Sequence, residues 1–123
     1  MGLDQWLDGV EYRPNRNNGK RQIIKTLEGS FYNARQIHEY ILEKNPDNGY
    51  YCDRIELTKE QLEDIVNVFN GVLKNKDSAS EVLPDPYERY DEFYFNQIKE
   101  FVDVCMTIIN NDGYEWSEYS YWG

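Results

Sequence analysis

The sequence predicts an α+β domain in which three helices cover one face of a mostly antiparallel sheet of about four strands, in the chain order ββαβααβ. Two patterns lead to this prediction. Four segments alternate or are rich in strand-forming residues, and three others repeat apolar residues at helical spacing. Residues 1–123 have the length of a single domain and include 11 tyrosines, five phenylalanines and three tryptophans. These aromatic side chains can build a core although the mean hydropathy is −0.84.

The first half of the chain predicts a hairpin, a helix and a strand. Residues 3–12 and 22–27 are expected to be strands, and the Pro, Asn and Gly residues between them mark a loop. From residue 33 to residue 44 the apolar residues lie one and two helical turns apart, and the sequence NPDNG ends this helix. Residues 51–57 alternate with period two, which is typical of a strand.

The second predicted helix begins with a capping box. The hydroxyl of Thr58 is expected to accept a hydrogen bond from the backbone N–H of Gln61, whose side chain accepts one from the N–H of Thr58. From there to residue 75 the apolar residues fall on one helical face. They are Leu62, Ile65, Val66, Phe69, Val72 and Leu73.

The last part of the chain predicts a loop, a long helix and a strand. Residues 76–86 have no period, so a loop is expected there. Residues 87–111 predict the longest helix, with a left-handed cap at Gly113, and residues 114–122 predict a strand that completes the sheet. The core face of this helix is expected to carry Tyr94, Ile98, Phe101, Val102, Cys105, Ile108 and Ile109.

The formal charge of −10 is unevenly distributed. Residues 1–49 hold seven basic and seven acidic side chains, whereas residues 50–123 hold six basic and sixteen acidic ones. Such a surface repels nucleic acid and anionic membranes and attracts basic protein surfaces. We therefore expect a protein partner and no direct contact with nucleic acid or membrane. No segment approaches the roughly 18 apolar residues that span a bilayer.

The two cysteines favour a reducing compartment. Cys52 falls in a predicted strand and Cys105 in a predicted helix, and neither has a CxxC partner or a neighbouring histidine. Two buried free thiols are expected rather than a metal site, and no cofactor is indicated. The first residues carry charge and lack the apolar run of a signal sequence, which predicts a cytoplasmic location.

Four segments of the chain form a recognisable set: residues 1–7 (MGLDQWL), the histidine-bearing helix at 34–41, the strand-to-helix joint at 55–62 and the aromatic end at 119–122. Together they resemble a family of small uncharacterised proteins of bacteriophages and prophages. Members of the family begin MGLD, followed by an aromatic residue and leucine. The chain departs from them at 30–33, where SFYN replaces a cationic YWRK, and at 83–88, which replaces a Gly- and Phe-rich loop. The resemblance implies a phage accessory protein in the host cytoplasm and implies no reaction.

Familiar catalytic motifs do not occur. The sequence contains no P-loop, Rossmann fingerprint, HExxH or EF-hand pattern. A small enzyme centred on His38 is one alternative, but no Ser or Cys nucleophile is tied to this histidine by a motif, and a structural role is the other. Adjacent carboxylates, as at Glu63 and Asp64 or Asp91 and Glu92, point about 100° apart on a helix and so do not converge on one atom.

Basic residues of the first half offer a second alternative. They could bind a small anionic ligand such as a nucleotide, with help from the aromatic residues, or they could lie on a solvated loop. The residues of this alternative site are Arg13, Arg16, Arg21, Arg35 and His38.

The acidic half suggests the function that we expect. Side chains three or four positions apart on a helix stand about 5–6 Å from each other, close to the spacing of successive phosphates. Carboxylates on rigid helices can therefore imitate a nucleic-acid backbone and fill the basic channel of a host defence protein, in the manner of anti-CRISPR or anti-restriction inhibitors. Charge that serves only solubility is the alternative. The expected interface comprises the acidic residues Glu60, Glu63, Asp64, Glu92, Glu100 and Asp103 and the aromatic anchors Tyr87, Tyr90 and Tyr94.

Overall fold

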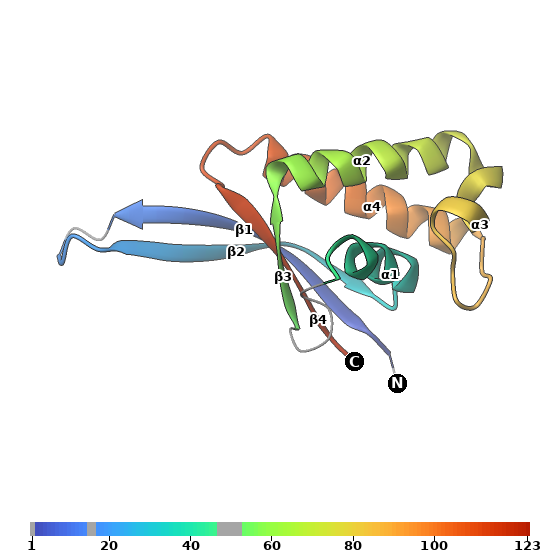
Figure 1. Cartoon of the computed structure of the whole chain (residues 1–123), viewed down its shortest axis with the longest axis horizontal. Coiled ribbons are helices and arrows are strands. Elements are labelled where there is room, and N and C mark those ends of the chain that lie inside the picture. The colour runs from blue at the N-terminus through green and yellow to red at the C-terminus, as the bar shows by residue number, and fades with distance from the viewer. Residues whose placement is uncertain (1, 15–16, 47–52) are drawn as a thin grey trace.

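Four antiparallel strands form one sheet in the computed structural model, which describes residues 2–14, 17–46 and 53–123 (Figure 1). The strands are β1 (Asp4–Pro14), β2 (Arg21–Tyr32), β3 (Arg54–Thr58) and β4 (Trp116–Trp122). Their spatial order is β2-β1-β4-β3, so the C-terminal strand lies inside the sheet and pairs with both β1 and β3. The predicted antiparallel sheet and the α+β class are confirmed.

The described residues form four α-helices rather than the three that the sequence predicts. They are α1 (Arg35–Lys44), α2 (Lys59–Lys74), α3 (Ala79–Val82) and α4 (Glu92–Ile109), with a 3₁₀ turn η1 (Lys76–Ser78) before α3. The additional helix falls in the segment expected to be a loop. Ala79 and Leu83, four positions apart, are both fully buried, and their attachment to the core holds this segment in a helical turn.

The third predicted helix starts later than expected and ends differently. Asp91 has extended backbone angles and its Oδ1 accepts a hydrogen bond from the backbone N–H of Tyr94 at 3.0 Å, so α4 begins at Glu92 and not at residue 87. The left-handed cap expected at Gly113 is wrong, because Gly19 is the only glycine of the described ranges with a positive φ. The helix ends instead at Asn110, whose N–H donates to the carbonyl of Met106.

Local signals in α2 are confirmed. Thr58 Oγ1 accepts from the backbone N–H of Gln61 at 3.1 Å, and Gln61 Oε1 accepts from the N–H of Thr58 at 2.8 Å, which completes the capping box. The predicted core faces of α2 and α4 are buried except at Leu73 and Ile109, which are partly buried.

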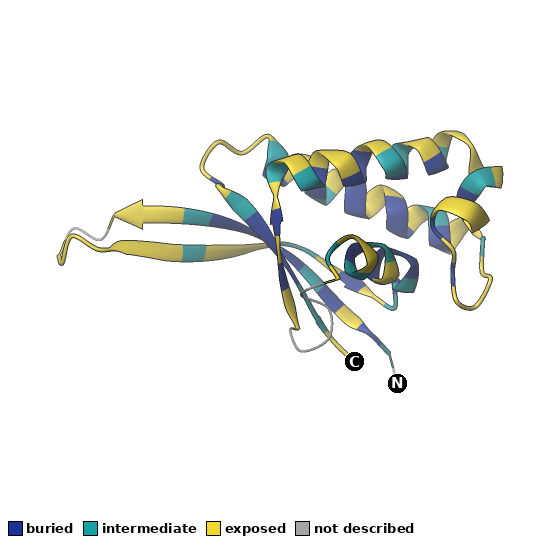
Figure 2. Cartoon of the chain, viewed as in Figure 1, coloured by how far each residue is buried: buried dark blue, intermediate teal, exposed yellow. Residues whose placement is uncertain are grey.

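The core lies between the helices and one face of the sheet (Figure 2). Leu7, Ile55 and Tyr119 lie side by side in register on that face and are fully buried. The ring of Phe31 packs on Phe101 of α4 with centroids 5.2 Å apart. Gly29 allows this close approach, because a Cβ at this position would lie 2.6 Å from a side-chain carbon of α4.

One end of the hairpin extends beyond the rest of the sheet. β4 pairs with β1 only from Asp4 to Val10, so residues 11–14 and 21–24 form a two-stranded ribbon that projects from the body, to the left in Figure 1. We call residues 11–24 the arm. No described residue of the arm is buried, as the yellow colour of this end in Figure 2 shows.

The prediction of two buried free thiols can be compared with the structure at Cys105 only. Cys105 is a free and fully buried thiol in α4, and its burial raises the pKa of the thiol. Cys52 lies outside the described residues. Among the helices of the described ranges, none is both long and apolar enough to cross a bilayer.

Candidate functional site

The acidic residues predicted for the interface lie on two helices that pack against each other. The ring centroids of Phe69 on α2 and Phe101 on α4 are 5.8 Å apart, and Lys59 Nζ donates a hydrogen bond to the carbonyl of Asn111 at 2.8 Å. The start of α2 therefore lies beside the end of α4, and the helices run antiparallel. We call the six carboxylates on them the acidic helix surface. Its members are Glu60, Glu63, Asp64, Glu92, Glu100 and Asp103.

Every residue of the acidic helix surface is exposed. Three ion pairs occur among the described residues, namely Glu11 with Arg13, Lys25 with Glu118, and Asp85 with Arg89. None of them involves the acidic helix surface, although Lys74 and Lys99 belong to the same two helices. Its negative charge is therefore not cancelled by a direct ion pair within the described chain.

The six carboxylates do not form one continuous row. Glu60 and Glu63 lie at the end of the helix pair where α4 finishes, and Glu100 and Asp103 follow along α4 from the middle. Glu92 lies about 16 Å of helix length from Asp103, at the opposite end. Asp64 faces away from α4 and lines a groove between α1 and α2. The six carboxylates are therefore divided into separate groups along the two helices, and the continuous row that the sequence analysis expected is interrupted.

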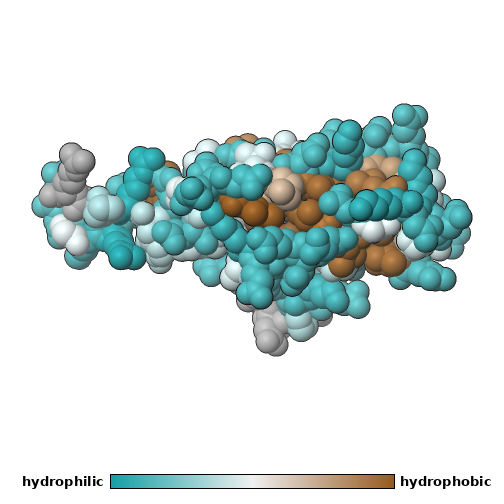
Figure 3. Space-filling view, turned by 90° about the horizontal axis from the view of Figure 1, so that it is seen from above, coloured by the Kyte–Doolittle hydropathy of each residue, from teal (hydrophilic) through white to brown (hydrophobic). Residues whose placement is uncertain are grey.

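The surface around these charges is amphipathic. Seen from above, the helix-bearing half of the molecule shows a band of apolar side chains bordered by hydrophilic ones, whereas the projecting end is almost entirely hydrophilic (Figure 3). An apolar centre with a charged rim is the usual composition of a protein-protein interface.

The three predicted aromatic anchors differ in exposure. Tyr87 is 59% exposed, and the guanidinium of Arg89 lies 4.8 Å from the centre of its ring. Tyr90 is half-buried, and its hydroxyl accepts a hydrogen bond from the backbone N–H of Asp85. Tyr94 is only 2% exposed and donates its hydroxyl proton to the carbonyl of Leu83 at 2.7 Å, so it belongs to the core and cannot anchor a partner.

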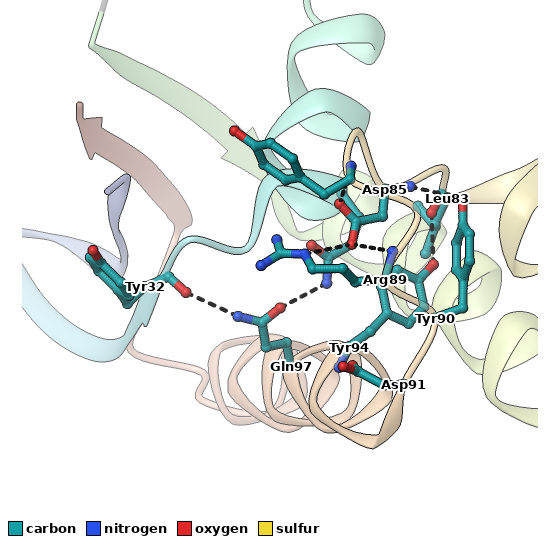
Figure 4. Close-up of polar contacts among 10 residues, drawn as sticks. Tyr32, Leu83, Asp85, Arg89, Tyr90, Asp91, Tyr94 and Gln97 are labelled. Atoms are coloured by element: carbon teal, nitrogen blue, oxygen red, sulfur yellow. Dashed lines mark hydrogen bonds and ion pairs between the residues drawn. The ribbon is translucent and has the colours of Figure 1, made fainter. Parts of the chain in front are cut away.

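The sequence analysis missed the residue that shapes the loop between α3 and α4. Asp85 is 5% exposed, and its carboxylate accepts hydrogen bonds from the backbone N–H groups of Tyr87 and Arg89 and from Arg89 Nε (Figure 4). Such bonds to N–H groups two and four positions ahead are typical of an Asx turn, which the sequence PDPYER could have indicated. The carboxylate therefore fixes the backbone of Tyr87 and Arg89, and the backbone N–H of Asp85 holds the hydroxyl of Tyr90.

A second buried polar contact joins α1, α4 and β2. Gln36 Nε2 donates to Gln97 Oε1 at 2.9 Å, and Gln97 Nε2 donates to the carbonyl of Tyr32 at 3.0 Å (Figure 4). Both glutamine side chains lie on the predicted apolar side of their helices, and the helical spacing alone identifies neither as a polar core residue. The pairing stabilises the arrangement of the two helices because each buried amide finds a partner.

His38 lies in the core and not at an open site. Its Nδ1 is 2.8 Å from the hydroxyl of Tyr119, which also accepts a hydrogen bond from Gln5 Nε2, and its ring packs on Tyr121 with centroids 4.5 Å apart. Burial is the main cause that lowers the pKa of His38. The Tyr119 hydroxyl accepts from Gln5 and still has its own proton to donate, which Nδ1 of a neutral imidazole can accept. This arrangement matches the structural alternative for His38.

The basic residues of the alternative ligand site are not brought together. Arg13 and Arg21 lie on the arm, where Arg13 pairs with Glu11 and the guanidinium of Arg21 lies 5.8 Å from the ring centre of Tyr12. Arg35 lies in the first turn of α1, beyond the opposite end of β1, and its Nε is buried without a hydrogen-bond partner. Arg16 lies outside the described residues.

The groove between α1 and α2 has a volume of about 470 Å³. Its apolar floor includes Ile41, Leu57 and Ile65, and the rim carries the opposite charges of Lys44 and Asp64. This volume lies within the range of small-molecule sites, roughly 300–1,000 Å³. The sequence did not indicate this groove, because the pairing of α1 with α2 depends on tertiary packing.

No family model, no curated protein and no solved structure matches the chain. Within residues 2–14, 17–46 and 53–123, no three His, Cys, Asp or Glu side chains are grouped so that they could hold a metal ion.

Proposed function

We propose that this protein is a stoichiometric inhibitor that binds another protein and blocks its nucleic-acid-binding site. The observation that carries the proposal is the acidic helix surface, whose six carboxylates are exposed and take part in none of the ion pairs found among the described residues. Carboxylates that lack ion-pair partners attract a protein that supplies cations. A nucleic-acid-binding protein does so, because it contacts the phosphates with Lys and Arg side chains.

The contact is expected to include apolar area as well as charge. The apolar band with its hydrophilic border in Figure 3 provides that area. Tyr87 is the best aromatic anchor because 59% of its side chain is exposed and the buried carboxylate of Asp85 fixes its backbone. Tyr90 contributes its exposed edge, and Tyr94 is no longer included.

The class of target follows from the charge and from the resemblance to phage proteins. A small phage protein that enters a host cytoplasm meets nucleases and other defence proteins with basic channels, and a carboxylate surface competes there with the phosphate backbone. Because the attraction is electrostatic over a distance, the association rate should rise at low ionic strength.

Charge-reversal variants with a matched control test the proposal. The first variant carries Glu60→Lys, Glu63→Lys and Asp103→Lys on the acidic helix surface. The control carries Glu39→Lys, Glu43→Lys and Glu81→Lys, which are exposed on α1 and α3 and change the net charge by the same amount. Wild type and control should capture a nucleic-acid-binding protein from host lysate and inhibit its activity at a one-to-one ratio. The first variant should do neither, while circular dichroism shows both variants folded.

Two outcomes contradict the proposal. One is inhibition that persists in the first variant, because the acidic helix surface is then not the contact. The other is an equal loss of inhibition in both variants, because net charge rather than the placement of the carboxylates then accounts for binding.

A second proposal keeps small-ligand binding but moves it to the groove between α1 and α2. Its volume and its rim of opposite charges fit a zwitterionic or amphipathic molecule better than the dispersed arginines fit a nucleotide. A ligand of this kind should raise the melting temperature of the wild type and leave that of Asp64→Ala or Lys44→Ala unchanged. A shift that survives both substitutions excludes the groove.

A further inference from the structure

The sheet has one face that the core does not use. Side chains alternate along each strand, and those of β1 at positions 5, 7 and 9 point to the helices. All the strand residues in the core cluster lie on that side: Leu7, Phe31, Ile55, Leu57, Tyr119 and Tyr121. The alternate positions form the opposite face, which we call the open face. None of the described helices contributes to it.

Aromatic and apolar side chains gather on the open face. All three tryptophans of the chain have open-face positions, and so do five of the nine large hydrophobic residues that are exposed in the described ranges. The tryptophans are Trp6, Trp116 and Trp122, and the five exposed residues are Tyr12 (41%), Ile23 (51%), Leu27 (58%), Tyr32 (59%) and Trp122 (72%). A monomer rarely gathers so much apolar surface on one side unless that side binds something.

The molecule exposes more surface than a compact chain of its size. Its accessible surface is 7920 Å², against about 6,900 Å² expected for a monomer of 14.7 kDa. The excess of about 1,000 Å² is comparable to the roughly 800 Å² that each partner buries in a stable interface. The arm accounts for part of the excess, because an isolated two-stranded ribbon exposes both of its faces.

Charges on the open face differ between the arm and the body. The arm end carries Arg21, and the arm as a whole has a net charge of +3 against −13 for the other residues. In the body of the sheet, Asp8, Glu118 and Glu56 lie in one row across β1, β4 and β3. Like charges placed side by side across strands repel, and two cations stand beside this row, Lys25, which binds Glu118 at 2.9 Å, and Arg54, which lies two positions from Glu56 on the same face.

A face with a positive arm and a row of three carboxylates in its body is complementary to itself when turned around, because the arm supplies cations beyond the two that already stand beside the row. We infer that the open face binds the open face of a second copy of this chain, with the two sheets stacked and the arm of each copy over the carboxylate row of the other. The contact is isologous, so both copies bury the same residues. It is independent of the proposed function, because the acidic helix surface lies on the far side of each sheet and stays free.

The mass of the full chain in solution tests this inference. Light scattering after gel filtration should give twice 14.7 kDa over a dilution series at low ionic strength. Leu27→Glu, which places a charge in the centre of the open face, should give the monomer mass. Phe93→Glu is the matched control, because Phe93 is 61% exposed but lies on α4, and this variant should remain a dimer.

A second variant tests the charge argument. Arg21→Glu reverses a cation of the arm end and should raise the dissociation constant of the dimer by about tenfold or more. Added salt should likewise raise the dissociation constant of the wild-type dimer. A wild type that is monomeric at every concentration overturns the inference, and it does so even if the open face is then found to bind a different protein. So does a dimer that Phe93→Glu breaks and Leu27→Glu leaves intact.

Discussion

The helix-covered body and the arm use the same two strands but are stabilised differently. In the body, β1 and β2 pack on α4 through Leu7 and Phe31, which are at most 8% exposed. In the arm, the same strands bury no described residue; besides their own ladder they have the contact of Tyr12 with Trp116 and that of Arg21 with the Tyr12 ring. The body carries the negative charge and the arm carries positive charge. Backbone pairing with a few surface contacts thus continues a strand beyond its core, but it leaves apolar side chains such as Ile23 exposed for a partner.

The difference also separates the two interaction surfaces. The acidic helix surface lies on two helices attached to the core, so the backbone positions that carry its carboxylates are fixed without a partner. The arm and the open face expose Ile23 and Leu27, whose apolar area is favourable only when covered. A pre-organised charged surface suits recognition of a foreign protein, whereas exposed apolar area suits a contact that is permanent.

The largest effect is expected from a truncation in the core of the body. Phe101 is fully buried and contacts both Phe31 and Phe69. Phe101→Ala should therefore lower the free energy of unfolding by about 3–5 kcal/mol, as measured by urea denaturation. The control Phe93→Ala removes an equally large but 61% exposed ring from the same helix and should cost less than about 1 kcal/mol. If both variants lose the same free energy of unfolding, the core does not stabilise the body in the way described.

A smaller effect should appear in the pH dependence of the body. Burial, aided by Arg35 and opposed by Glu39, lowers the pKa of His38 in the folded state. Below the ordinary value of 6.5 the unfolded chain therefore binds a proton that the folded chain does not, and stability falls as the pH decreases. The slope should reach at most about 1.4 kcal/mol per pH unit between about pH 6.5 and 5.5.

His38→Gln removes this titration and should flatten the stability curve over the same range. Asp8 contributes with the opposite sign at lower pH, because burial and the neighbouring Glu118 raise the pKa of its carboxyl. A slope that persists in His38→Gln assigns the pH dependence to another group, since the chain has one histidine.

The elements that the sequence predicted well are those with local causes. The capping box at Thr58 and the buried faces of α2 and α4 depend on residues within a few positions of each other. The start of α4 was wrong because Asp91 has extended backbone angles and binds the backbone N–H of Tyr94, which a helix from residue 87 would bond to the carbonyl of Tyr90. The strand order was not predicted, because pairing of β4 with β1 joins residues more than 100 positions apart.

The same distinction holds for the candidate sites. Exposure of the acidic residues follows from helical periodicity, and it is found at all six positions. Their relative placement depends on how α2 packs against α4, and so the sequence could not separate Asp64 from the others. Alternation in β1 and β4 places Trp6 and Trp116 on one face, but only the packing of the helices decides which face remains open.

The smallest effect is expected at an arginine of the arm. Arg13 pairs with Glu11, but the side chain of Arg13 is 64% exposed, so Arg13→Ala should change the free energy of unfolding by less than about 0.5 kcal/mol. Arg89 is the matched arginine of the body, because its Nε binds the buried carboxylate of Asp85 at 3.3 Å. Arg89→Ala leaves that carboxylate short of one partner and should cost about 1–2 kcal/mol in the same denaturation experiment. If Arg13→Ala costs as much as Arg89→Ala, an exposed ion pair of the arm stabilises the fold as much as one with a buried carboxylate of the body, and the contrast between arm and body is wrong.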